Sequence, residues 1–297
     1  MTGPDDTVNT ARTRETVKQA ESGGGPHPVA SGLPVGDLLG REPFTVDLPV
    51  PEVVLAVGAH PDDIEFGCGA TLAKWATAGS DLHYLVLTDG SKGSWDPGAD
   101  RALLVDVRRA ECRAAAVVVD AVPEGAVPSA DRVSFLERVD GELENGIDER
   151  RALARAIRTI RPTVLLGHDP WRRYRLHPDH RAAGFITVDG LVAARDPHFF
   201  AELGLEPHRP DSLVLWEADL PNHLEDARGF EAAKVDALLC HHSQLESSMG
   251  ITTTPANGGP SGAQRTELAT KVRRQLADHG SICGLPSAEA FRLMTDL

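Results

Sequence analysis

Histidines and aspartates gather in two short segments of this 297-residue chain. The first reads A-H-P-D-D-I-E at residues 59–65, and the second reads H-P-D-H at residues 177–180. Imidazole and carboxylate are ligands that suit zinc and related divalent metals. Two histidines and one carboxylate would make a three-ligand site that leaves a coordination position open for water. The two segments together therefore point to metal-assisted hydrolysis.

Two neighbouring aspartates in the first segment could divide the work of such a site. Asp62 and Asp63 stand in an expected tight turn, so their side chains should point in different directions. One could bind a metal while the other faces water on that metal, which is where a general base is required. Taken singly, each segment could be only a helix start, with an aspartate as N-cap or with Pro178 in the first turn. Their occurrence together favours the metal site.

Apolar runs before these segments predict the elements that position them. Residues 53–57 form an unbroken apolar run that is typical of a strand buried on both faces, and residues 163–167 resemble it. Further strands are expected at 82–87 and 213–216, and helices at 67–78, 101–119, 151–161, 178–194 and 230–240. This alternation predicts an α/β fold, a Rossmann-like and mainly parallel sheet flanked by helices. Ligands bind outside the carboxyl ends of such strands, so both segments should meet at one edge.

The two ends of the chain differ in character. Residues 1–42 mix charged residues with Ser, Gly and Pro, which predicts a flexible N-terminal leader. Residues 43–297 are expected to form a single α/β catalytic domain. Within it, residues 250–263 have the composition of a loop, and the chain is expected to end in one or two short helices.

Composition excludes several classes of function. Lys and Arg number 30 against 44 Asp and Glu, a net charge of −14 that argues against nucleic-acid or anionic-membrane partners. The four cysteines form no C-x-x-C pair, so neither a disulfide framework nor a cysteine zinc site is expected, and a reducing cytoplasm is the expected compartment. No apolar run approaches the roughly 18 residues that a membrane span needs. The oligomeric state stays open, a homo-oligomer included.

The two histidine segments in combination resemble those of the PIG-L/LmbE-like family of zinc-dependent N-deacetylases. The likeness runs from about Val53 to Gln244 and includes T-D-G at 88–90, R-x-x-E from Arg108, and H-x-S-Q at 241–244. The family includes the deacetylases of mycothiol and bacillithiol biosynthesis. The resemblance implies an LmbE-like fold and an enzyme that hydrolyses the N-acetyl group of an N-acetylglucosamine-type conjugate, a small-molecule amino-sugar substrate.

Roles for the histidines and aspartates follow from this resemblance. It makes three residues the ligands of one Zn²⁺ per chain: His60, Asp63 and His180. Asp62 becomes the general base, and His177 faces the developing oxyanion or the leaving amine; either of the two could protonate that amine. Asp179 would orient His177 and raise its basicity.

The resemblance also implies residues that bind the substrate. Arg108 would help hold it, although a helix-surface salt bridge to Glu111 is the structural alternative. Asp140 would match a sugar-contacting aspartate, although Asp-Gly at 140–141 is equally a turn signal. Some members place a tyrosine two residues before the first histidine of H-P-D-H, whereas Tyr174 lies three before it, which leaves its role at the oxyanion open.

Loops are expected to choose the substrate, at 91–100, 123–147, 169–176 and 250–263. Trp95 and Trp171 lie in two of them and could stack on a sugar face or only pack their loops. His168 and His223 could each face the cleft or lie elsewhere.

Three other functions compete with deacetylation. A metal-dependent amidase could remove a larger acyl group from a thiol conjugate. A phosphoesterase could hold two metals about 3.5–4 Å apart, with Asp89 and His168 as candidate ligands of the second. A non-enzymatic nucleotide-binding module is disfavoured because no glycine-rich phosphate loop follows the first strand.

Overall fold

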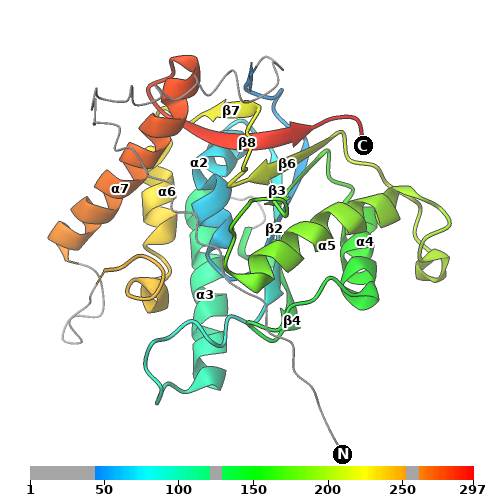
Figure 1. The fold of residues 1–297 in the computed structure, drawn as a ribbon, viewed down its shortest axis with the longest axis horizontal. Helices are drawn as coiled ribbons and strands as arrows, with labels where there is room; N and C mark the ends of the chain where they lie inside the picture. Colours follow the sequence, from blue (N-terminus) through cyan, green and yellow to red (C-terminus); the bar gives the residue numbers. More distant parts are fainter. Residues whose placement is uncertain (1–43, 121–128, 252–260) are drawn as a thin grey trace, which may run out of the picture. The chain divides into compact units, whose positions relative to one another are not determined.

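One sheet of eight strands organises the described residues of the computed structural model, which are 44–120, 129–251 and 261–297 (Figure 1). The expected leader at 1–42, and residues 252–260 of the expected loop, lie outside this described part. The strands are β1 (Thr45–Val46), β2 (Val53–Gly58), β3 (Asp81–Thr88), β4 (Val133–Arg138), β5 (Val164–His168), β6 (Ser212–Trp216), β7 (His223–Asp226) and β8 (Ala288–Met294). The helices are α2 (Asp63–Thr77), α3 (Arg101–Asp120), α4 (Ile147–Ile160), α5 (Pro178–Arg195), α6 (Glu231–Leu238) and α7 (Gly262–Gly280).

The strand order is β1-β7-β8-β6-β5-β2-β3-β4. β8 runs antiparallel to β6 and β7, and the other neighbouring pairs are parallel. The expected mainly parallel α/β sheet is therefore confirmed. β2 and β5 are neighbours with Val54 opposite Val164, so the segments that follow both strands emerge at the same edge of the sheet.

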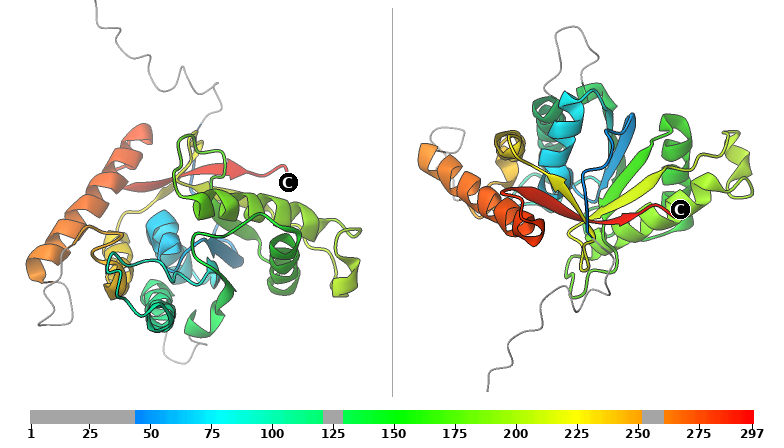
Figure 2. Two further views of the ribbon diagram at one scale, coloured as in Figure 1. Left: turned by 60° about the horizontal axis from the view of Figure 1, so that its bottom comes forward. Right: turned by 90° about the horizontal axis from the view of Figure 1, so that it is seen from above.

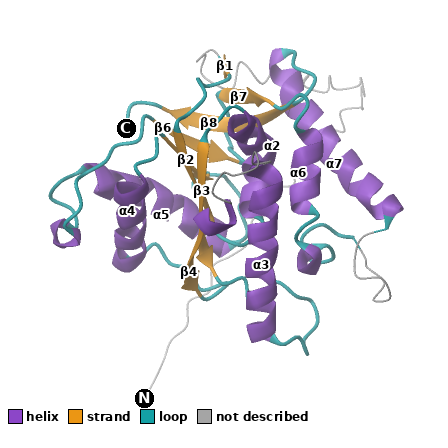
Figure 3. Cartoon of the chain, turned by 180° about the vertical axis from the view of Figure 1, so that it is seen from behind, coloured by secondary structure: helices purple, strands orange, loops and turns teal. Residues whose placement is uncertain are grey.

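Alternating residues of the central strands pack against two different layers of helices. Val54 and Ala56 of β2 belong to a core shared with α2 and α3, whereas Leu55 and Val57 belong to a core shared with α4 and α5. Burial on both faces explains why β2 is apolar without a break. Figures 2 and 3 show α4 and α5 on one side of the strands and α2, α3 and α6 on the other. No helix in the described part of the chain is long and apolar enough to cross a bilayer.

The C-terminal segment corrects the sequence prediction. After α7, which packs on α6 through a third apolar cluster, the chain adds the strand β8 where a short helix was expected. The β8 sequence A-E-A-F-R-L-M is rich in helix formers, and its pairing with two strands overrides that preference. β4 likewise lies inside the segment 123–147, which was expected to be a loop.

Helix α2 begins at Asp63, earlier than predicted, and is broken at Cys68, whose backbone is not helical. Two charged side chains satisfy the backbone groups at this break. Lys234 Nζ donates to the Phe66 carbonyl at 2.7 Å, and the Glu289 carboxylate accepts from the Thr71 amide at 2.8 Å. Lys234 and Glu289 are themselves paired at 2.5 Å and buried. The break therefore links α2 to α6 and β8.

Candidate metal and active site

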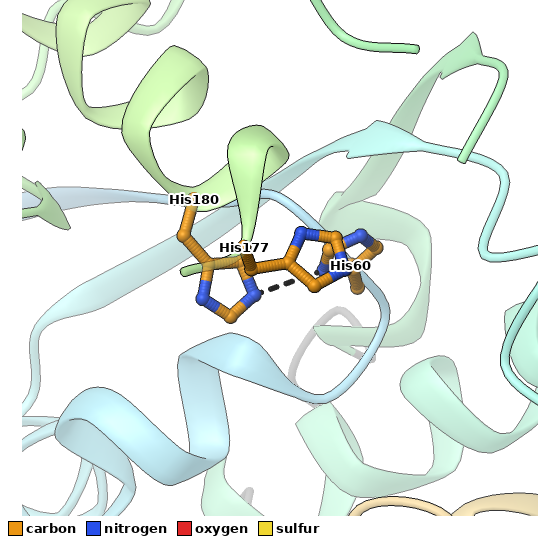
Figure 4. A group of neighbouring side chains, drawn as sticks. All are labelled: His60, His177 and His180. Atoms are coloured by element: carbon orange, nitrogen blue, oxygen red, sulfur yellow. Dashed lines mark hydrogen bonds between the residues drawn. The ribbon is translucent and has the colours of Figure 1, made fainter. Parts of the chain in front are cut away.

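Three side chains from distant parts of the sequence meet at the edge of the sheet. Nδ1 of His60 lies 3.1 Å from Nε2 of His180, and the two oxygens of Asp63 lie 3.2 Å from His180 Nε2 and 3.3 Å from His60 Nδ1. His60 follows β2, Asp63 is the first residue of α2, and His180 is in the first turn of α5. Figure 4 shows the approach of His60 to His180, with His177 beside them.

Local hydrogen bonds fix the turn that carries two of these residues. The backbone amide of His60 donates to Asp63 Oδ2 at 2.7 Å, and the amide of Asp62 donates to the His60 carbonyl at 2.9 Å. Asp62 contacts Arg108 and Asp63 contacts His180, so the two side chains point apart, as expected. The position of Asp63 at the N-terminus of α2 also favours its negative charge.

Two buried carboxylates set the tautomer of His60. Its Nε2 lies 3.1 Å from Asp179 Oδ2 and 3.2 Å from Asp140 Oδ1, so Nε2 carries the proton and Nδ1 keeps its lone pair. Asp179 is anchored in turn by the backbone amides of Gly141 at 2.6 Å and Leu143 at 3.2 Å. Burial alone would raise the pKa of the Asp140 carboxyl, but its hydrogen bond to His60 lowers that pKa to about 2.

His168, at the end of β5, supports Asp63. The indole of Trp216 donates to His168 Nδ1 at 3.0 Å, so the proton of His168 is on Nε2, which lies 3.2 Å from Asp63 Oδ2. His168 was one of the two histidines whose placement the sequence left open. The other, His223, lies in β7 away from this cluster and contacts Thr45 and Glu225.

Arg175 lies on the far side of His180. Its Nε is 3.1 Å from His180 Nδ1, and its guanidinium also pairs with Glu217. Because a guanidinium only donates, His180 Nδ1 accepts here and its proton is on Nε2. For a metal to bind at Nε2, the proton would have to move to Nδ1, and Arg175 would have to release Nδ1 and keep only its pairing with Glu217.

The donor set fits a small divalent metal. A tetrahedral zinc ion with ligand distances of about 2.0–2.1 Å separates its ligand atoms by about 3.3–3.4 Å. The three contacts among His60, Asp63 and His180, at 3.1–3.3 Å, are close to this spacing. Three groups of described residues bring their ligand atoms within 4.8 Å of one another: His60 with His177 and His180, Asp63 with His168 and His180, and His60 with Asp140 and Asp179. The cluster could therefore hold a metal.

Asp62 is buried beside the cluster, and Arg108 holds it. Arg108 Nη2 donates to Asp62 Oδ1 at 3.2 Å, and Nη1 donates to the Gly90 carbonyl at 2.9 Å. Burial raises the pKa of the Asp62 carboxyl, and the positive charge of Arg108 limits the increase. The alternative pairing of Arg108 with Glu111 is not formed, because Glu111 accepts hydrogen bonds from Ser243.

His177 lies over the other two imidazoles. Its ring stacks on that of His180 with centroids 4.8 Å apart and meets the ring of His60 edge-on at 4.7 Å. Partial burial and the charges of these neighbours lower the pKa of His177, which favours a neutral imidazole. Asp179, which was expected to orient His177, lies against His60 instead.

A cavity of about 620 Å³ opens over these residues. Asp140 and Arg108 line it, as does Trp95, whereas Tyr174 is 94% exposed and lies outside the lining. Lys92, from the loop expected at 91–100, also lines the cavity, and several other lining residues were not predicted from the sequence: Phe66, Glu217, Ser247, Ser248 and Gln275. Glu217 directly follows β6, so only the rule that ligands bind outside the carboxyl ends of parallel strands could have suggested it. The others reach the cavity through helix and loop packing.

Comparisons with known proteins identify similar deacetylases. The family model described as GlcNAc-PI de-N-acetylase, PIG-L, matches residues 55–191. A diacetylchitobiose deacetylase from Thermococcus kodakarensis is 32% identical over 213 residues, which are 70% of this chain and 76% of that protein. A 1D-myo-inositol 2-acetamido-2-deoxy-alpha-D-glucopyranoside deacetylase from Thermomonospora curvata is 32% identical over 48% of this chain and 54% of its own length.

Solved structures show the same fold. The N,N'-diacetylchitobiose deacetylase from Pyrococcus horikoshii superposes with a TM-score of 0.69 and 26% identity, covering 82% of this chain and 84% of its own. The 4-carboxy-2-hydroxymuconate hydratase GalB from Pseudomonas putida, at 19% identity, has a TM-score of 0.63 over 82% of this chain and 96% of its own. Since this fold also carries a hydratase, function must be argued from the site.

Proposed function

Because this chain belongs to the GlcNAc-PI de-N-acetylase (PIG-L) family, we propose that it is a zinc-dependent hydrolase that releases acetate from an N-acetylated amino-sugar conjugate. One observation carries the proposal. Nδ1 of His60 lies 3.1 Å from Nε2 of His180, one carboxylate oxygen of Asp63 lies 3.2 Å from His180 Nε2 and the other lies 3.3 Å from His60 Nδ1, and the separate carboxylate of Asp62 lies buried beside them.

In this proposal His60, Asp63 and His180 hold one zinc ion. The metal, when bound, supplies a Lewis acid that polarises the acetyl carbonyl and lowers the pKa of water toward about 7. Asp179 and Asp140 keep the proton of His60 on Nε2, and His168 holds Asp63. Such supporting hydrogen bonds orient the ligands and increase their basicity.

Asp62 is the general base. It takes the proton from the water that attacks the acetyl carbon, and its burial makes it a better proton acceptor than an exposed carboxylate. Arg108 donates through Nη1 and Nη2 to Asp62 and to the carbonyls of Pro61 and Gly90, so its role is to position the base.

His177 faces the reacting amide. It is the exposed imidazole of the cluster, and it carries an N–H that can donate to the developing oxyanion or deliver a proton to the leaving nitrogen. Its lowered pKa keeps it neutral near pH 7, which suits hydrogen-bond donation to the oxyanion, and the proton that Asp62 has taken from the water is then available to the leaving nitrogen. After collapse of the tetrahedral intermediate, the products are acetate and the free amine.

The geometry gives little support to a two-metal phosphoesterase. Asp89 Oδ1 already accepts from the backbone amides of Ser91 at 2.9 Å and Asp140 at 3.1 Å. His168 directs Nδ1 to Trp216 and Nε2 to Asp63. Both candidate ligands of a second metal therefore have structural partners, which supports a site for one metal.

Acetate release tests the proposal. Zinc-loaded protein would be incubated with N-acetylglucosamine, N,N'-diacetylchitobiose and an inositol conjugate of N-acetylglucosamine, with Asp62→Asn in parallel. We expect acetate and a free amine from the wild type and almost none from the variant. Absence of acetate across the panel, from protein that contains stoichiometric zinc, would refute deacetylation of these sugars and favour a larger acyl group.

A further inference from the structure

We infer that Ser243 is a positioning residue for the general base, although it lies outside the described lining of the cavity. It holds the Glu111 carboxylate away from Arg108, and Arg108 thereby stays paired with Asp62. The inference rests on the proposed function only for the role of Asp62 as the base. It gives a role to Glu111 of the R-x-x-E motif and to the serine of the H-x-S-Q motif.

The guanidinium of Arg108 has a buried donor that is not used. Nη1 donates to the Gly90 carbonyl, and Nη2 donates to the Pro61 carbonyl and to Asp62. The side chain is only 2% exposed, and its Nε has no hydrogen-bond partner in the described part of the chain. A buried donor without an acceptor costs free energy. The guanidinium should therefore turn toward a carboxylate that comes within reach of Nε.

Glu111 is a carboxylate that could reach Arg108. Both residues lie on α3 and are three positions apart, a spacing at which helix side chains are neighbours. Opposite charges at this spacing attract each other, and burial strengthens the attraction because the local dielectric constant is low. A guanidinium that moved toward Glu111 would turn away from Asp62. The pairing that helix geometry favours would thus weaken the contact that supports the base.

Two donors of Ser243 occupy the Glu111 carboxylate. The backbone amide donates to Oε1 at 2.8 Å, and the hydroxyl donates to Oε2 at 2.6 Å. Gln244 Nε2 donates to Ser243 Oγ at 3.0 Å, so the hydroxyl accepts from Gln244 and directs its own proton to Glu111. Gln244 Nε2 also lies 3.1 Å from the Gly93 carbonyl, which accepts from it. A chain of hydrogen bonds therefore holds Glu111 on Ser243.

The fold fixes Ser243 beside α3. Ser243 lies in the short 3-10 helix His242–Gln244 that follows α6, and Figure 3 shows α6 beside α3. The preceding residue, His241, is fully buried, and its Nε2 lies 3.3 Å from the carboxylate of Glu65 on α2. The segment is thereby attached to α2 as well as to α3, and this attachment sets the position of Ser243 relative to Glu111.

Ser243→Ala removes the hydroxyl and tests the inference. With the sugar that the wild type deacetylates fastest, we expect kcat of the zinc-loaded variant to fall about 10–100-fold, the scale for misplacing a catalytic group. KM and zinc content should stay close to the wild-type values, because Ser243 is outside the described lining of the cavity. Ser80→Ala is the matched control, since it removes a buried hydroxyl that donates to the Pro51 carbonyl at 2.6 Å, next to the amino end of β3. It should keep the wild-type kcat.

Removing the competing carboxylate separates a positioning role from a purely structural one. In the Glu111→Gln background, Ser243→Ala should change kcat by less than about twofold, because no charge remains to draw Arg108 away from Asp62. Ser243→Thr keeps the hydroxyl and should retain the activity that Ser243→Ala loses. Equal losses in both backgrounds, or a wild-type kcat in Ser243→Ala, would overturn the inference.

A crystal structure of zinc-loaded Ser243→Ala gives a readout that does not depend on activity. We expect Glu111 to accept a hydrogen bond from Arg108 Nε, and the contact between Arg108 and Asp62 to be lost. A Glu111 side chain that stays away from Arg108 would overturn the inference. If the wild type releases no acetate from any of the sugars, the proposed function fails, whereas this structure still decides whether Ser243 controls the partner of Arg108.

Discussion

Oδ2 of Asp179 lies 3.1 Å from Nε2 of His60, on the side of the imidazole opposite to the atom that approaches His180. This contact fixes which nitrogen of His60 is free for a metal. Asp179 is fully buried and is itself held by two backbone amides, so the imidazole cannot rotate without breaking several hydrogen bonds. The site is therefore preorganised by residues that do not touch the metal position.

Asp179→Asn should weaken zinc binding by about 10–100-fold, the usual effect of losing a supporting carboxylate. Asparagine keeps the size of the side chain but removes the charge that stabilises the His60 proton. Competition with a chromophoric chelator would measure the zinc dissociation constant. Asp189→Asn, on the same helix but bonded to Asn145, is the matched control and should bind zinc normally. Equal affinities of the two variants would contradict the role of Asp179.

His180→Ala should abolish stoichiometric binding of zinc, because it removes one of the three proposed ligands and leaves only His60 and Asp63. Metal content after dialysis, measured by inductively coupled plasma mass spectrometry, checks this. His83→Ala removes an imidazole that hydrogen-bonds to Asp81 and belongs to β3, and it should retain the metal. One zinc ion per chain in His180→Ala would show that the ligand set is wrong.

Asp62→Asn should keep zinc but lose about 10²–10⁴ in kcat, the scale of a general acid–base residue. Amide and carboxylate have the same shape, so the hydrogen bond from Arg108 can persist while the proton acceptor is lost. Acetate release and zinc content would be measured on the same preparation. Turnover at the wild-type rate would exclude Asp62 as the base.

Glu289→Ala should lower the free energy of unfolding by about 3–5 kcal/mol, because Lys234 would remain buried without its partner. The same change leaves the backbone amides of Ala70 and Thr71, at the break in α2, without their hydrogen-bond acceptor. Urea denaturation followed by circular dichroism measures the loss. Glu267→Ala, which breaks an exposed pair with Lys271, should cost less than about 0.5 kcal/mol. Equal decreases in the free energy of unfolding for the two variants would contradict a larger contribution from the buried pair than from the exposed one.

Because of Glu217, the free energy of unfolding should depend on pH under acidic conditions. Burial alone would raise its pKa, but His168 and Arg175 lower it from 4.5 to about 2. Since the folded-state pKa is the lower one, the stabilisation is complete above 4.5 and is lost as pH falls from there toward about 2. The difference in Tm between wild type and Glu217→Gln should therefore be larger at pH 7 than at about pH 3. A difference that does not change with pH would contradict this linkage.

The sequence by itself determined the features that local chemistry encodes. The unbroken apolar run of β2 predicted burial on both faces, and the turn after it placed Asp62 and Asp63 in different directions. Because ligands bind outside the carboxyl ends of parallel strands, residues 59–65 and 177–180 were predicted to meet. Nδ1 of His60 lies 3.1 Å from Nε2 of His180. These predictions depend on the pattern of apolar residues and on the expected strand direction, and both can be derived from a single sequence.

Only the tertiary structure decided the partners of each side chain. Asp179 supports His60, which is 119 residues away, and not its near neighbour His177. Trp216 sets the tautomer of His168 because β6 lies beside β5. Strand order and helix packing determine such contacts, and they leave no periodic signal in the sequence. For the same reason the helix-forming residues of β8 become a strand: pairing with β6 and β7 outweighs their local preference.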